Sequence, residues 1–456
     1  MTITIPSTTT FAVHDPATTE VIAQVADGTA ADARAAVDAA AAAFPAWAAT
    51  PSRVRAEVLR RAFALIVADT EHLAALIHSE NGKSLDDARA EVGYAAEFFR
   101  WFSEEAVRTE GSYGESPAGG TRTIVMHKPV GVAALVTPWN FPAAMATRKI
   151  APALAAGCTV VLKPAAETPL TALAIAELLT AAGVPEGVVG VVPTTAPAEV
   201  VSTWLTDDRV RKVSFTGSTD VGKVLLKLAA DRVLNSSMEL GGNAPFVVTA
   251  DADIEAAVAG AMIAKFRNAG QACTAANRFF VHEDVLDKFV ASLGEAIEGL
   301  QVAPLISAKA VDGVTALVDE AVDAGARLTH RGSTDTGGWF YPATLLVDVH
   351  PGMRIAREEI FGPVVSVITW RDEQAMLAQA NDSESGLAAY VYAGRLQDAL
   401  RIAEGLEAGM VGVNRGVVSD PSTPFGGVKQ SGIGREGARE GIREYQETQY
   451  FSVDWT

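Results

Sequence analysis

Three side chains in separate parts of the sequence could together oxidise an aldehyde. Cys273 closes an AGQAC string, Glu239 opens an ELGG string, and Asn140 lies in a PWNFP string. A thiolate can attack a carbonyl carbon and later leave from a thioester, and a carboxylate can deprotonate the water that hydrolyses this thioester. An amide N–H can donate to the oxyanion that forms in between. A lone cysteine, glutamate or asparagine is usually structural, but the three strings together indicate covalent acyl chemistry.

The segment 217–223, GSTDVGK, is a candidate phosphate-binding turn. It follows an apolar run and opens a helical pattern, so its backbone N–H groups can face a phosphate at the positive end of a helix. Its spacing is similar to that of a P-loop, but Val224 occupies the position where a Mg²⁺ site needs Ser or Thr. This difference argues against a kinase or an ATPase.

Chain length, charge and cysteine content narrow the classes of protein that fit this sequence. At 456 residues the chain predicts two or more domains. Its net charge of −18 and its lack of a long Lys/Arg cluster argue against nucleic acid and anionic membrane as partners. It has two cysteines, scattered histidines, no basic and apolar leader over Met1 to Phe11, and no apolar run of about 20 residues. We therefore expect a cytoplasmic protein without a disulfide framework, a metal site or a membrane span.

The first part of the sequence is helical. Thr29 with Asp32 predicts a capped helix that Pro45 ends. Two further amphipathic helices fit residues 53–79 and 85–108.

The rest of the sequence predicts a hairpin and two α/β domains. Glycines and alternating residues over 111–128 are typical of a projecting hairpin. From Gly131 onward, apolar runs alternate with helical patterns, which indicates parallel sheets with crossover helices. We place the boundary between the two domains near Glu239, so the cysteine and its base lie close to the junction.

Several strings in the same order resemble those of the aldehyde dehydrogenase superfamily, and within it the succinate-semialdehyde dehydrogenases. Between residues 138 and 432 these strings are PWNFP, KPAAETP, FTGS, ELGG, GQAC, EIFGP and PFGGVKQSG. The resemblance implies an α/β fold with a Rossmann-type dinucleotide-binding domain, an α/β catalytic domain and a β-hairpin oligomerisation element. The dinucleotide-binding domain would span 1–110 and 131–238, and the catalytic domain would span 239–430. The oligomerisation element would comprise 111–130 and 446–456. The resemblance also implies a homodimer or a homotetramer.

The resemblance implies a role for each matching residue. Cys273 would be the nucleophile, Asn140 and the Cys273 N–H would hold the oxyanion, and Glu239 would activate water. The implied cofactor contacts are Lys163 for the adenosine ribose, Gly217, Ser218 and Gly222 for the pyrophosphate, and Glu359 and Phe361 for the nicotinamide ribose and ring. Trp139 either packs beside the cofactor or fills the core. Cys158, which enters a buried strand pattern, is interpreted as a core residue.

The choice of dinucleotide and of substrate depends on a few positions. Ala166 stands where NAD-preferring relatives carry a glutamate that repels a 2′-phosphate, so NAD and NADP both remain candidates. Arg148, Arg267 and Ser419 match the positions that hold the distal carboxylate in succinate-semialdehyde dehydrogenases, and a guanidinium is a natural bidentate partner for it. We therefore expect NAD(P)-dependent oxidation of a short semialdehyde, with succinate semialdehyde to succinate first. The alternatives are a broad aliphatic or amino-aldehyde dehydrogenase, and a non-catalytic structural oligomer on the same fold.

Overall fold

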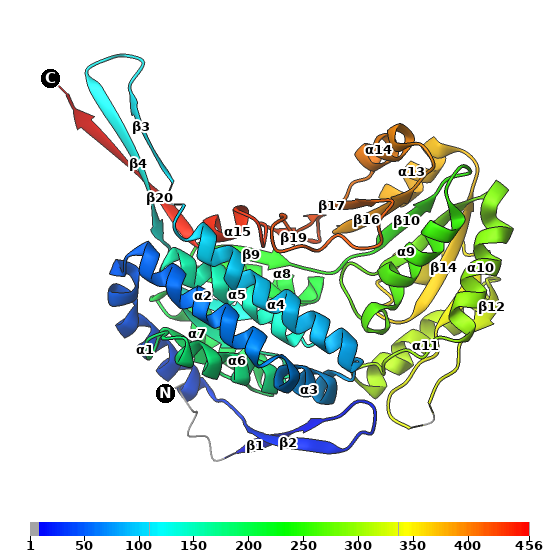
Figure 1. The fold of residues 1–456 in the computed structure, drawn as a ribbon, viewed down its shortest axis with the longest axis horizontal. Helices are drawn as coiled ribbons and strands as arrows, with labels where there is room; N and C mark the ends of the chain where they lie inside the picture. The colour runs from blue at the N-terminus through cyan, green and yellow to red at the C-terminus, as the bar shows by residue number, and fades with distance from the viewer. Residues whose placement is uncertain (1–8, 109, 336, 456) are drawn as a thin grey trace.

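Two mainly parallel β-sheets, each covered by helices on both faces, form the body of the molecule (Figure 1). The computed structural model describes residues 9–108, 110–335 and 337–455. Residues 1–8 and 456, which belong to two of the predicted segments, lie outside the described residues. The arrangement of helices around parallel sheets confirms the predicted α/β fold class.

The first sheet has the strand order β19-β9-β8-β5-β6-β7 within the described chain. Its strands are β5 (Val132–Val136), β6 (Thr159–Lys163), β7 (Val189–Val191), β8 (Val210–Thr216), β9 (Asn235–Glu239) and β19 (Gly432–Ile433). All pairs are parallel except β19 with β9. The chain leaves the central strand β5 toward β6 on one side and later adds β8 on the other. Such a switch of direction opens a crevice at the carboxyl ends of the strands.

Helices cover the first sheet in layers. The helices are α1 (Ala30–Ala49), α2 (Ser52–Ala68), α3 (Thr70–Asn81), α4 (Leu85–Glu105), α5 (Pro142–Ala156), α6 (Leu170–Ala181), α7 (Pro197–Thr206) and α8 (Thr219–Ala230). One face carries α1, α7 and α8, while the other carries α5 and α6. The helices α2, α3 and α4 form an outer layer over α5 and α6 (Figure 1).

Two helix boundaries differ from the prediction. The capping box of Thr29 and Asp32 is present, but α1 continues through Pro45 to Ala49. Trp47, which is 2% exposed, anchors this last turn in the core and compensates for the hydrogen bond that the proline cannot make. The predicted helix over 53–79 is two helices, α2 and α3, because the backbone leaves the helical conformation at Asp69.

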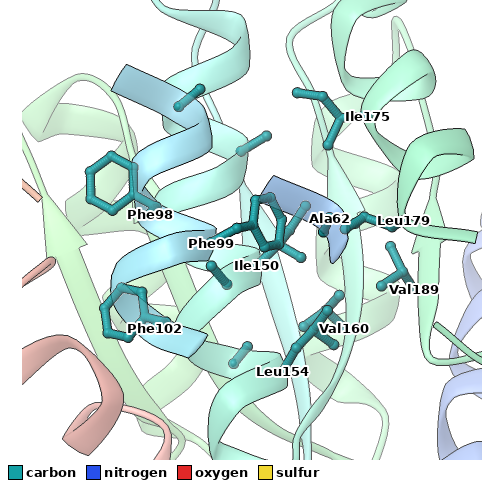
Figure 2. Close-up of a cluster of buried hydrophobic side chains, with 14 of the residues drawn as sticks. Ala62, Phe98, Phe99, Phe102, Ile150, Leu154, Val160, Ile175, Leu179 and Val189 are labelled. Atoms are coloured by element: carbon teal, nitrogen blue, oxygen red, sulfur yellow. The ribbon is translucent and has the colours of Figure 1, made fainter. Parts of the chain in front are cut away.

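Aromatic side chains of α4 fill the space between the outer helices and the first sheet. Phe98, Phe99 and Phe102 are fully buried; the Phe98 and Phe102 rings lie on one side of the helix, and the Phe99 ring points to the other side, toward Ile150 (Figure 2). They pack with Ile150 and Leu154 of α5 in the same cluster. This packing holds α5, which begins at the PWNFP string, between α4 and the sheet.

The second sheet has the order β12-β13-β14-β11-β10-β16-β17 within the described residues. Its strands are β10 (Ala244–Val248), β11 (Ala276–His282), β12 (Arg327–Arg331), β13 (Thr344–Val347), β14 (Val364–Trp370), β16 (Ala388–Tyr392) and β17 (Met410–Val413). Only the pairing of β12 with β13 is antiparallel among them. Its helices are α9 (Ile254–Phe266), α10 (Leu286–Glu298), α11 (Ala308–Asp323), α12 (Arg354–Arg357), α13 (Glu373–Asn381) and α14 (Leu396–Gly405).

Smaller elements complete the chain. They are β1 (Thr10–His14), β2 (Val21–Ala26), β15 (Ser385–Gly386), β18 (Val428–Lys429), α15 (Glu440–Arg443) and the short 3₁₀ helices η1 (Arg267–Gly270) and η2 (Glu283–Val285). The predicted hairpin is present as β3 (Gly111–Glu115) and β4 (Thr121–Pro129). The last strand, β20 (Gln446–Asp454), pairs with β4, and this three-stranded sheet projects from the body (Figure 1).

None of the helices that the structure describes has the length and apolar character needed to cross a membrane.

Removing one aromatic ring from the core should test how far α4 holds the first sheet together. Phe99→Ala leaves a cavity at a site with 0% exposure. We expect the free energy of unfolding, measured by urea denaturation, to fall by about 3–5 kcal/mol. Gly93→Ala on the same helix is the control, because an added methyl there meets nothing within 4 Å. It should raise stability by about 0.5–1 kcal/mol, and equal changes in both variants would contradict the packing role of Phe99.

Candidate active site

The three candidate catalytic residues share one cavity of about 220 Å³ at the carboxyl ends of the first sheet. The loop after β5 carries Asn140, β9 ends at Glu239, and Cys273 reaches the cavity from the second half of the chain. The predicted residues in its walls are Trp139, Asn140, Gly217, Ser218, Glu239, Cys273, Glu359 and Phe361. The structure thus brings together residues that the sequence separates by more than two hundred positions.

An unusual backbone segment delivers Cys273 to this cavity. Within η1, Asn268, Ala269 and Gly270 all have left-handed φ values, of 52°, 54° and 75°. Such a conformation is costly for residues other than glycine and occurs where the surrounding structure enforces it. At Gly270 a Cβ atom would lie 2.3 Å from the carbonyl oxygen of Gly362, so only glycine fits there.

Two glycines let the ELGG segment pass between the Cys273 backbone and Glu359. A Cβ atom on Gly242 would lie 2.4 Å from the Cys273 carbonyl oxygen. A Cβ atom on Gly241 would lie 2.8 Å from Oε2 of Glu359. The Gly242 N–H also donates to Oε1 of Glu359 over 3.3 Å. The string that carries Glu239 is therefore shaped by close contact with both partners.

Burial sets the protonation of the two reactive groups. It raises the pKa of the Cys273 thiol to about 12, and the Glu359 carboxylate adds to this while the Arg148 guanidinium opposes it. Burial also raises the pKa of Glu239 well above its usual range, with a second contribution from Glu436. The Cys273 thiol is therefore protonated at neutral pH in the protein alone, and Oε2 of Glu239 has no hydrogen-bond partner among the described residues.

A buried cluster of charges lies beneath Glu239. Lys149 Nζ is 2.6 Å from Glu436 Oε1, and Arg148 Nε is 3.3 Å from Glu436 Oε2. Lys149 also donates to Ser214 Oγ over 2.9 Å. We did not predict Lys149 or Glu436 from the sequence. A signal exists, because α5 is otherwise apolar, and two adjacent cations in such a helix require buried partners.

Pro138, Trp139 and Asn140 of the PWNFP loop line the same cavity. Asn140 is 5% exposed, its Nδ2 donates to the Gln271 carbonyl oxygen over 3.0 Å, and its Oδ1 is unpartnered among the described residues. Trp139 packs edge-on against Phe361 with ring centroids 5.5 Å apart. Trp139 is thus half-buried in the cavity wall, and one of its neighbours is the ring predicted to contact the nicotinamide.

The start of α8 can receive a phosphate. Ser218 caps this helix by accepting from the Val221 N–H, and the backbone there opens into the cavity and into an adjoining groove of about 590 Å³. Lys223 lines the same groove. The positive helix end and this lysine suit a pyrophosphate, so the residues present fit a dinucleotide.

Three predicted cofactor residues lie outside both spaces. Gly222 is buried, and a Cβ atom there would lie 2.5 Å from Leu240, so its smallness lets α8 approach the cavity wall. Lys163 and Ala166 follow at the carboxyl end of β6, the next strand of the sheet. Burial lowers the pKa of Lys163, and Glu167 partly offsets this effect.

A second cavity, of about 150 Å³, contains two of the three predicted carboxylate-binding residues. Arg267 and Ser419 line it together with Tyr94, and the Arg267 guanidinium lies 4.8 Å from the centre of the Phe141 ring. Arg148 does not line this cavity. Its Nη2 donates to the Tyr94 hydroxyl over 2.9 Å, and Tyr94 is also hydrogen-bonded to Ser419. Tyr94, which we did not predict, therefore links Arg148 to the cavity.

The fold and this site define a member of the aldehyde dehydrogenase family. A sequence model of that family, described as the aldehyde dehydrogenase family, matches residues 4–451. The chain belongs to this family, and it is an NAD(P)-dependent oxidoreductase.

Individual relatives are similar over nearly the whole chain. A succinate-semialdehyde dehydrogenase of Paenarthrobacter nicotinovorans is 53% identical over 95% of this chain and 98% of its own length. A glutarate-semialdehyde dehydrogenase of Pseudomonas aeruginosa is 46% identical over 97% of this chain and 94% of its own. Among solved structures, one described as an Escherichia coli NADP-dependent enzyme is 45% identical with a TM-score of 0.96, covering 98% of this chain and 95% of that one.

The reactivity of Cys273 toward an alkylating reagent should depend steeply on pH. Because the pKa of its thiol is about 12, the reactive thiolate is scarce at neutral pH. We expect the rate of iodoacetamide labelling of the dinucleotide-free protein to rise about tenfold per pH unit between about pH 7 and about pH 10. Mass spectrometry of the Cys273 peptide measures this rate, and fully buried Cys158 is the internal control. A plateau near neutral pH would show that the thiolate is stabilised instead.

Proposed function

We propose that the protein oxidises a short semialdehyde, with succinate semialdehyde to succinate as the first candidate. The observation that carries this proposal is the position of Arg267 at the start of η1, six residues before Cys273, in a small cavity with Ser419. A substrate held by its distal carboxylate at Arg267 would present its aldehyde toward the thiol. The name of the Paenarthrobacter relative supports this choice.

The chemistry would begin at the small thiolate fraction of Cys273, whose proton has passed to water. Its sulfur adds to the aldehyde carbon, and the carbonyl oxygen becomes an oxyanion that accepts from the Asn140 amide and the Cys273 N–H. A nicotinamide dinucleotide, when bound, supplies the acceptor for the hydride that leaves this carbon. The carbon is then a thioester on Cys273.

Glu239 would release the product. Its carboxylate removes a proton from the water that attacks the thioester carbon, and the Cys273 sulfur leaves as the acid forms. The raised pKa of Glu239 suits this role, because a carboxylate with a raised pKa is a stronger base than an ordinary one. Glu436, whose charge contributes to the raised pKa of Glu239, is held by Lys149 Nζ at 2.6 Å.

The domains follow from these roles. We assign 1–110 with 131–238 to dinucleotide binding, and 239–430 to the catalytic thiol and its surroundings.

Ala166 leaves room for the 2′-phosphate of NADP, and the exposed Glu167 next to it favours NAD, so both dinucleotides stay in the proposal. The description of the similar Escherichia coli structure as an NADP-dependent enzyme supports NADP.

The projecting sheet supports self-association. We propose that 111–130 with 446–456 forms an oligomerisation element of a homodimer or a homotetramer. Tyr113, Tyr450 and Trp455 expose 65%, 57% and 60% of their surface on this sheet or at its end, and such apolar exposure is typical of interfaces.

We also propose a cytoplasmic location. Both cysteines are free thiols, and a reducing compartment keeps cysteines in this state.

A specific observation favours glutarate semialdehyde as a second candidate substrate. The Pseudomonas relative carries that name and is 46% identical to this chain. A substrate one methylene longer would keep the same carboxylate contact. Binding pockets distinguish one methylene by only about 1–3 kcal/mol, so kcat/KM for aldehydes of increasing length, each with NAD and with NADP, should be compared directly.

Removing the Arg267 guanidinium should separate acidic from neutral aldehydes. For Arg267→Ala we expect KM for succinate semialdehyde to rise about 10- to 100-fold, since a charge-assisted hydrogen bond contributes about 1.5–3 kcal/mol. KM for butanal, which has similar length and no carboxylate, should stay nearly unchanged. Steady-state kinetics measure both, and Arg327→Ala, an exposed arginine on β12, is the control variant. Equal losses on the two aldehydes would refute the carboxylate role and favour a broad aldehyde dehydrogenase.

Replacing the base should divide the reaction into its two halves. Glu239→Gln keeps the shape of the side chain but cannot accept a proton. We expect a first-turnover burst of NAD(P)H followed by a steady-state rate about 10²–10⁴-fold lower than that of the natural protein. Stopped-flow absorbance measures both phases, and hydroxylamine, which attacks a thioester without a base, should restore turnover. Loss of the burst as well would assign Glu239 to an earlier step.

A further inference from the structure

A second buried ion pair lies against the catalytic loop, on the outer side of the first sheet. Lys83 follows the left-handed cap of α3 at Gly82, and Glu91 lies on α4. Their side chains are 1% exposed, with Nζ 2.5 Å from Oε2 of Glu91. Both residues line the cavity that contains Arg267, but neither has a role in the chemistry derived above. A buried ion pair is by itself a weak source of stability.

Lys83 holds the backbone of the oxyanion residue. Its Nζ donates to the carbonyl oxygen of Asn140 over 2.9 Å and lies 4.0 Å from the centre of the Phe141 ring. The same carbonyl oxygen accepts from Nδ2 of Asn268 over 2.9 Å. The Asn140 backbone is therefore fixed from two sides by buried donors, one of them from the segment that delivers Cys273.

Glu91 caps the helix that follows this loop. Its Oε1 accepts from the backbone N–H groups of Ala143 and Ala144 over 2.9 and 3.3 Å. The residue at the N-cap position of α5, Phe141, makes no side-chain capping bond. A carboxylate at this end is favourable because the helix dipole is positive there. Glu91 thus supplies from α4 the cap that α5 lacks.

We propose that Lys83 and Glu91 form a positioning pair that holds the Asn140 amide and the first turn of α5 in register with Cys273. This rests on the proposed function, since it assigns the amide of Asn140 to the oxyanion. The three hydrogen bonds that leave the pair end on the backbone of residues 140, 143 and 144, so the pair clamps one short segment. The same helix carries Arg148 and Lys149 one to two turns later, so the clamp also orients the charges beneath Glu239.

The double variant Lys83→Met with Glu91→Met tests the proposal without leaving a lone buried charge. Replacing both members of a buried pair by apolar residues is often neutral for stability, so the variant should fold. Glu91→Gln, which keeps the volume and one acceptor oxygen, is a milder second variant. The control is Glu80→Gln, because Glu80 is also a buried carboxylate that caps a helix, accepting from the Leu170 and Thr171 N–H groups of α6 over 2.7 and 3.0 Å.

Two first-turnover rates report the geometry of the oxyanion site. One is the release of nitrophenolate from p-nitrophenyl acetate without dinucleotide, and the other is the NADPH burst with succinate semialdehyde. A displacement of about 1 Å can cost about 100-fold in rate, so we expect the double variant to lose at least about tenfold in both rates. Glu91→Gln should lose less in the same direction, and Glu80→Gln should keep both rates whatever its melting temperature.

The outcomes are distinct. Unchanged first-turnover rates in the double variant would overturn the proposal, and so would an equal loss of rate in Glu80→Gln, which would indicate a general loss of structure. If the natural protein oxidises no semialdehyde, yet its acylation by the ester slows in the double variant, the proposed substrate fails and the positioning role stands.

Discussion

The site depends on charged groups that are removed from water together. Lys149, Arg148 and Glu436 form one buried group beneath Glu239, and Lys83 with Glu91 forms another beside Asn140. A lone charge in such a place would be strongly unfavourable, so each member constrains where its partner lies. The same desolvation raises the pKa of Glu239 and of Cys273. The removal of these groups from water thus both fixes the positions of the charged side chains and raises the pKa values of the two reactive groups.

Small residues make this arrangement possible. The charges lie in layers that meet at the carboxyl ends of the first sheet, where backbone from several segments is closely packed. The Cys273 carbonyl oxygen packs closely against Gly242, and the Gly362 carbonyl oxygen packs closely against Gly270. The lack of a side chain at Gly222 lets α8 approach Leu240. A larger side chain at Gly242 or Gly270 would displace backbone, and one at Gly222 would displace the buried side chain of Leu240. The glycines of the conspicuous strings therefore serve the packing of the site as well as contact with a ligand.

Local patterns predicted the parts of the structure that depend on neighbouring residues. The α/β alternation, the hairpin over 111–128 and the capping box at Thr29 are all present. Eight of the predicted site residues line one cavity, and the strings PWNFP, FTGS and ELGG lie at the carboxyl ends of β5, β8 and β9. Two helix boundaries were predicted wrongly. Pro45 does not end α1, because the burial of Trp47 outweighs the effect of the proline, and the break between α2 and α3 at Asp69 was not predicted.

The partners of the buried charges could not be predicted in this way. Glu436 lies nearly three hundred positions from Lys149, and Tyr94 meets Arg148 across two helices. Such pairs depend on how helices and strands from distant parts of the chain are aligned in the fold. The local periodicity of the sequence contains no information on this alignment. Charged residues within otherwise apolar helices, as in α5, were the available signal that buried partners exist without identifying them.

The position of the two cysteines affects how the protein withstands peroxides. Cys158 precedes β6 at the amino end of the parallel strands, whereas Cys273 lies at their carboxyl ends, and the chain has no other thiol. A sulfenic acid formed on Cys273 would find no resolving cysteine within its own chain, so further oxidation to an irreversible sulfinic acid would follow. The high pKa of its buried thiol counteracts this hazard, because oxidants attack the thiolate and the resting protein holds little of it. Burial therefore protects the nucleophile between turnovers.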